Sequence, residues 1–77
     1  MKVLPYKSLT ILYSSRKELD DGWIPDAWVE VPTGDQVTSY RVPIDSKNFF
    51  PTEPEAEAEA EKQARAWIDW IYPSASA

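Results

Sequence analysis

The stretch that decides the fold is residues 52–71, TEPEAEAEAEKQARAWIDWI. Thr52 followed three residues later by Glu55 is a capping box, in which each side chain satisfies a backbone N–H that the first helical turn leaves unpaired. Alanine, glutamate, lysine, glutamine and arginine fill the middle, and all of them are strong helix formers. Pro73 cannot continue a helix. The pattern therefore predicts a helix over residues 53–71.

The helical periodicity separates an apolar side from a charged side. At 100° per residue the apolar stripe, with its flanks, consists of Ala56, Ala60, Ala64, Trp67, Ile68, Trp70 and Ile71. Glutamate, lysine, arginine and aspartate occupy the opposite side. One helix cannot bury its own stripe, so the preceding residues must provide the surface that covers it.

Three segments ahead of the helix have the alternating pattern of strands. These are residues 7–15, 23–31 and 37–44, joined by a charged loop at 16–22 and a compact turn around Gly34. Met1 to Tyr6, interrupted by Pro5, is open to two interpretations, an edge segment or a loose arm. The fold class is thus predicted to be α+β, a three-stranded antiparallel β-β-β-α sheet with one C-terminal helix packed on one face.

Alternation also predicts which side chains of the sheet meet the helix. This face would hold Leu9, Ile11, Tyr13, Ala27, Val29, Val31, Tyr40, Val42 and Ile44. The chain would form a single domain over residues 1–72, followed by a disordered tail at 73–77.

Composition restricts the chemistry. The 77 residues contain neither cysteine nor histidine, so disulfides, thiolate or imidazole metal ligands and a serine–histidine nucleophile are excluded. The net charge of −5 opposes binding to phosphate backbones without sequence preference. No apolar run approaches the ~20 residues that cross a membrane, and no signal peptide is evident, so we expect a cytoplasmic protein.

Two acidic stretches have residue types that metal sites and carboxylate catalysis use. Glutamates alternate from Glu53 to Glu61, and Asp20-Asp21-Gly22 has acidic turn chemistry. Calcium needs six to eight ligands from a folded loop, and a carboxylate pair needs a pocket that separates its pKa values. A solvated helix face and a hairpin turn are the simpler interpretations, although Glu57 flanks the stripe and could pair with the sheet. No cofactor and no metal is predicted.

Aromatic and basic side chains outside the helix suggest a surface. A sheet covered by one helix leaves its second face open. The candidates for that surface are Leu12, Trp28, Arg16, Lys17 and Arg41. Tyr6 and Lys7 are a further aromatic and a further basic side chain of this group. Stacked nucleic-acid bases, a protein partner, or simple packing of Trp28 under the N-terminal arm or the 16–22 loop would each explain such a face.

Several short segments resemble those of a known class of proteins. Phe49-Phe50, Glu55-Ala56-Glu57 and Ala66-Trp67-Ile68-Asp69 are similar to the pattern of small uncharacterised bacterial β-β-β-α proteins. The architecture also resembles, more distantly, antitoxin domains that neutralise RNA-cleaving toxins and the β-β-β-α part of double-stranded-RNA-binding domains. Those RNA-binding domains begin their last helix with lysines, whereas this helix begins with acids.

These observations predict a small non-catalytic protein-interaction or accessory module, which uses the open sheet face or self-associates. Its partner would be another protein or a second copy, with no membrane and no evident small-molecule substrate. The alternative is a nucleic-acid-associated or antitoxin-like regulator.

Overall fold

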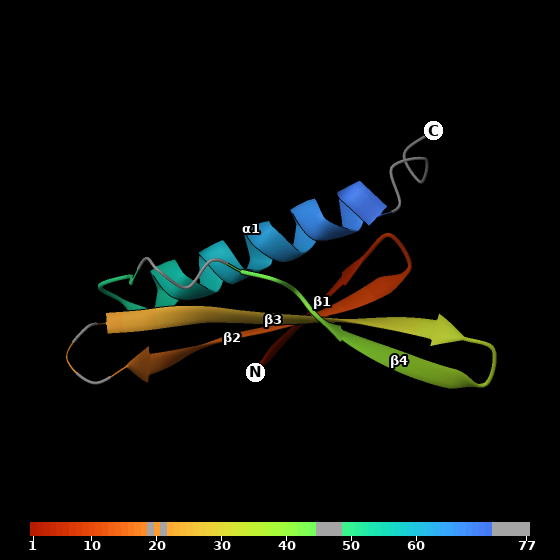
Figure 1. Cartoon of the computed structure of the whole chain (residues 1–77), viewed down its shortest axis with the longest axis horizontal. Helices are drawn as coiled ribbons and strands as arrows, with labels where there is room; N and C mark the ends of the chain where they lie inside the picture. The colour runs from red at the N-terminus through yellow and green to blue at the C-terminus, as the bar shows by residue number, and fades with distance from the viewer. Residues whose placement is uncertain (19, 21, 45–48, 72–77) are drawn as a thin grey trace.

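The computed structural model describes residues 1–18, 20, 22–44 and 49–71. The chain runs through β1 (Lys2–Tyr6), β2 (Leu9–Glu18), β3 (Gly22–Thr33), β4 (Gln36–Arg41) and α1 (Glu53–Ile71). The strands form one antiparallel sheet in the order β1-β2-β3-β4, and α1 lies across one face of it (Figure 1). The predicted α+β class is confirmed, and so is the single C-terminal helix.

The prediction of three strands was wrong, because the N-terminal segment is a strand in its own right. Lys2 pairs with Tyr13 at one end of β1, and Tyr6 pairs with Leu9 at the other. The turn between them consists of two residues, Lys7 (φ 51°) and Ser8 (φ 67°), both in the left-handed region. Two-residue hairpins need this conformation because its twist matches that of the strands.

The second and third strands are longer than the pattern predicted. β2 continues to Glu18 and β3 begins at Gly22, so most residues of the expected 16–22 loop lie in the two paired strands. By contrast, the last strand ends at Arg41 rather than at residue 44. Asp21 and residues 73–77, including the predicted tail, lie outside the described residues.

Pro25 is fully buried within β3, a strand with a neighbour on each side. The N–H of Val42 donates to the carbonyl of Ala27 (2.9 Å), so Ala27 directs its backbone groups toward β4. Hydrogen-bonded pairs alternate along an antiparallel ladder, so the backbone nitrogen of Pro25, two residues before Ala27, also points toward β4. The pairing of β3 with β4 stops at Trp28 and Arg41, so no ladder bond is lost at the proline.

The helix begins at the predicted residue, but its buried side is Ala56, Ala60, Ala64 and Ile68, while Ile71 and Trp70 of the predicted stripe are exposed. The backbone N–H of Glu55 donates to Oγ1 of Thr52 (3.4 Å), and that of Ala56 to the Thr52 carbonyl (3.2 Å). α1 packs mainly on β2 and β3. The buried core joins the two layers and consists of Ile11, Ala27, Val29, Val42, Ala60, Ala64 and Ile68, with Leu4, Tyr6, Leu9, Tyr13, Val31, Ile44 and Trp67 packed against it.

Tyr40 differs from the other sheet residues that were expected beneath the helix. It is 45% exposed, although its ring lies 6.1 Å from that of Trp67. Trp70, one turn further along the helix, is 79% exposed. The helix therefore covers the middle of the sheet, and on that same face of the sheet the part formed by β4 stays partly exposed.

Candidate protein interface

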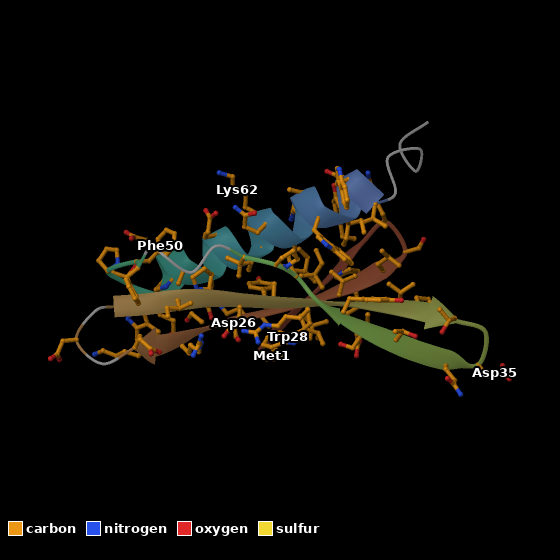
Figure 2. All side chains as sticks on the ribbon, in the orientation of Figure 1. Met1, Asp26, Trp28, Asp35, Phe50 and Lys62 are labelled. Carbon is orange, nitrogen blue, oxygen red and sulfur yellow. The ribbon has the colours of Figure 1, made fainter. Side chains whose placement is uncertain are left out.

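One row of side chains crosses the face of the sheet opposite the helix, which we call the open face. The strand registers place Val3 beside Leu12, Leu12 beside Trp28, and Trp28 beside Arg41. Figure 2 shows Trp28, with Asp26 and Met1, on the side of the sheet away from α1. Three of the five candidate residues, Leu12, Trp28 and Arg41, are thus adjacent.

Asp26 lies two residues before Trp28 in β3, and its carboxylate contacts one arginine of β2 and one of β4. Its Oδ1 accepts a hydrogen bond from Nη2 of Arg41 (3.0 Å), and its Oδ2 lies 3.2 Å from Nε of Arg16. The Asp26 side chain is 12% exposed, while those of Arg16 and Arg41 are 54% and 63% exposed. One carboxylate therefore contacts two guanidinium groups that both remain more than half exposed.

The Arg41 side chain also lies over the indole of Trp28. Its guanidinium carbon is 5.8 Å from the ring centroid, within the range of a cation–π interaction. Arg41 is thus held by Asp26 on one side and by the Trp28 ring on the other. The open face therefore presents an apolar row that ends in a charged side chain, Arg41, which contacts both Asp26 and Trp28.

Lys17 does not join the other candidates. β2 continues past Ser15, so Arg16 and Lys17 point to opposite faces of the sheet. Arg16 pairs with Ile24 on the open face, and Lys17 pairs with Trp23 on the helix side. The open face consequently combines Leu12, Trp28, Arg16 and Arg41 with two residues that the sequence did not single out, Val3 and Asp26.

A second polar cluster fastens the β1–β2 hairpin to the end of the helix. Oδ1 of Asp69 accepts hydrogen bonds from Lys7 Nζ (2.7 Å) and from the Tyr6 hydroxyl (2.8 Å). The Arg65 guanidinium lies 5.4 Å from the centroid of the Tyr6 ring. Tyr6 and Lys7 therefore link the β1–β2 hairpin to α1 through Asp69 and do not contribute to the open face.

These contacts shift the pKa values of the groups that make them. The hydrogen bonds from Lys7 and then Tyr6 lower the pKa of Asp69. The bond to Asp69 raises the pKa of Tyr6 and that of Lys7. Lys2 forms a similar link, since its Nζ lies 2.9 Å from Oε1 of Glu57, and that bond raises the pKa of Lys2. The expected pairing of Glu57 with the sheet is confirmed.

Among the described residues, no group of three or more histidine, cysteine, aspartate or glutamate side chains gathers as a metal site, and no pocket is found. No helix of the described ranges is long and apolar enough to cross a membrane.

Comparison with known proteins gives no relative. No family model, no curated protein and no solved structure matches this chain. The resemblance to bacterial β-β-β-α proteins stays a prediction.

Proposed function

We propose that this chain is a small non-catalytic protein-interaction module that holds a partner protein on the open face of its sheet. The observation that supports this function most strongly is the row from Val3 to Arg41. It combines a partly covered tryptophan, two aliphatic side chains and a charged group at one end. Binding hot spots are enriched in tryptophan and arginine, and they lie in patches of this mixed chemistry.

The chemistry of the row indicates what the partner should present. An apolar side chain would cover Leu12 and Trp28, and a carboxylate would accept the remaining N–H donors of Arg41 and Arg16. Val3 is 63% exposed, so it extends the apolar surface to the β1 edge. An extended or helical protein segment with an acidic residue beside an apolar one fits this face best.

A nucleic-acid partner is less well supported by the same residues. Asp26 already neutralises part of the charge of both arginines, and Glu18 lies 3.6 Å from Arg16. Affinity for a phosphate backbone depends on clustered cations that are free to replace counterions.

Binding measurements with matched tryptophan variants would test the proposal. Partners captured from the source cell by the wild-type chain would be purified and titrated against wild type, Trp28→Ala and Trp70→Ala. Loss of a buried tryptophan contact costs about 2 kcal/mol or more, so Trp28→Ala should weaken Kd by roughly thirtyfold. Trp70→Ala removes an exposed indole from the helix and should bind like wild type.

Two outcomes would contradict this function. One is a partner that binds both variants equally and shifts no backbone resonance of Leu12, Trp28 or Arg41. The other is salt-sensitive binding of single- or double-stranded RNA or DNA through the same residues, which would support the regulator alternative.

A further inference from the structure

Within the part of the chain that the structure describes, no strand pairs with the outer edge of β4. Edge strands are usually shielded by proline, lysine or a covering segment, because their free N–H and C=O groups can pair with another chain. β4 has the sequence QVTSYR, with no proline, lysine or acidic residue. Its apolar side chains are also exposed, Val37 by 62% and Tyr40 by 45%.

The hydrogen-bond phase shows which residues of β4 direct their backbone outward. The bond from Val42 to Ala27 makes these two a hydrogen-bonded pair. The alternation of the ladder then gives Tyr40 and Thr38 the same inward direction, toward β3. The intervening residues direct their N–H and C=O groups away from the sheet, and they are Val37, Ser39 and Arg41.

The opposite edge of the sheet is closed. Carrying the same alternation across β3 and β2 makes Leu4 an inward residue of β1 and leaves Val3 and Pro5 directed outward. Pro5 has no N–H, and its ring occupies the position that a pairing strand would need. Lys2 and Tyr6 further bind this edge to the helix, through Glu57 and Asp69.

We propose that two copies of this chain pair antiparallel through β4, with Ser39 opposite Ser39 of the partner subunit. Paired residues must share a face of the sheet, so a two-fold register has to be centred on a residue. Centring it on Ser39 places Val37 opposite the partner's Arg41, and every outward backbone group of the strand finds a partner. One continuous sheet results, with both helices on the same side.

Charge is compatible with this register. Arg41 is the one side chain of β4 that is charged near neutral pH, and it faces the partner's Val37 rather than a like charge. The acidic helices lie over β2 and β3, so four strand spacings, about 19 Å, separate their axes. This distance exceeds the Debye length of about 8 Å at physiological salt, and the net charge of −5 on each copy is therefore largely screened.

The pairing would also cover exposed side chains. Tyr40 would lie opposite the partner's Thr38, continuing the contact that Tyr40 makes with Trp67. Because both open faces lie on one side of the joined sheet, the dimer would present two copies of the row around Trp28. The dimer rests on the β4 edge alone, so it and the proposed function can fail separately.

Sedimentation from micromolar to millimolar concentration would test the pairing with two variants of one residue. Ser39→Pro removes an outward N–H that the monomer does not use, and proline is tolerated at such edge positions. It should weaken dimerisation at least about tenfold. Ser39→Ala keeps the N–H and should dimerise like wild type. Circular dichroism would establish that both variants retain the fold.

Amide hydrogen exchange of the wild-type chain provides a test that does not depend on a variant. The amides of Val37, Ser39 and Arg41 should become protected as concentration rises, while that of Thr38 is protected throughout. A monomer at millimolar concentration, or those three amides unprotected at every concentration, would overturn the proposal. So would a dimer that Trp28→Ala abolishes and Ser39→Pro leaves intact, because the copies would then meet through the open face.

Discussion

Gly22 lies directly against the carbonyl of Phe50. A Cβ built at Gly22 would be 2.7 Å from that oxygen, and the residue has φ of 118°, a conformation that side-chain-bearing residues rarely adopt. Next to it, Trp23 and Phe50 exchange two backbone hydrogen bonds of 2.8 and 2.9 Å. The approach to the helix is thus attached to the start of β3 at a point where only glycine fits.

Substitution of this glycine should therefore be costly. Gly22→Ala combines backbone strain with a steric clash, and we expect it to lower the free energy of unfolding by about 2–3 kcal/mol. Gly34→Ala is the matched control, because Gly34 has φ of 65° but no atom within 4 Å of its Cβ position. It should cost about 1 kcal/mol. Urea denaturation of both variants would measure the difference, and equal losses would contradict the clash.

The core prediction concerns Ile68, the largest buried side chain of the helix. It is 0% exposed, whereas Ile71, one turn on, is 40% exposed. Ile68→Ala should cost about 2–5 kcal/mol, from lost burial and the cavity that remains. Ile71→Ala removes the same atoms from a more exposed site and should cost under about 1 kcal/mol. Thermal and urea unfolding would compare the two, and similar losses would show that α1 does not pack as described.

The turn between β1 and β2 offers a stabilising substitution. Ser8 has φ of 67°, which costs a residue with a side chain about 1 kcal/mol relative to glycine. Ser8→Gly should therefore raise the free energy of unfolding by about 0.5–1 kcal/mol. Ser14→Gly, within β2, should lower it by a similar amount because glycine weakens strand interiors. A loss of stability in Ser8→Gly would mean that this turn is not of the two-residue hairpin type.

This turn also explains why sequence reasoning missed the first strand. Asn-Gly or Asp-Gly would have indicated a hairpin, but Lys7-Ser8 has neither residue type, and Pro5 argued against a strand. The helix was predictable to the residue because its signals are local: a cap, a run of helix formers and a regular apolar stripe. The first strand has no comparable local signal, although only two residues join it to β2.

The open face was predictable in part, for the same reason. Alternation alone placed the side chain of Trp28 on the other face of the sheet from those of Ala27 and Val29, and the structure confirms this. Grouping Arg16 with Lys17 assumed that the strand had ended by Ser15. Asp26 lies two residues from Trp28 in the same strand, so alternation could have placed it on the open face. Its contacts with Arg16 and Arg41 depend on the strand registers, which the alternation pattern of one sequence does not determine.

The Asp69 cluster predicts a dependence of stability on pH. The folded state holds the pKa of Asp69 below its ordinary value near 3.9, so the unfolded chain binds its proton more tightly. The resulting stability is fully present above the unfolded pKa and is lost as pH falls through the folded one. The pKa values of Lys7 and Tyr6 are raised instead, and their contribution disappears above pH about 10.

Substitution at position 69 should remove the acid part of this dependence. Urea denaturation of wild type, Asp69→Asn and Tyr6→Phe between pH about 2 and about 7 would reveal it, since this range spans the titration of aspartate. The wild-type free energy of unfolding should fall more steeply below pH about 4 than that of Asp69→Asn. Tyr6→Phe removes one of the two donors to Asp69 and should give an intermediate slope. Identical slopes for all three chains would show that the hairpin is not fastened to the helix through this carboxylate.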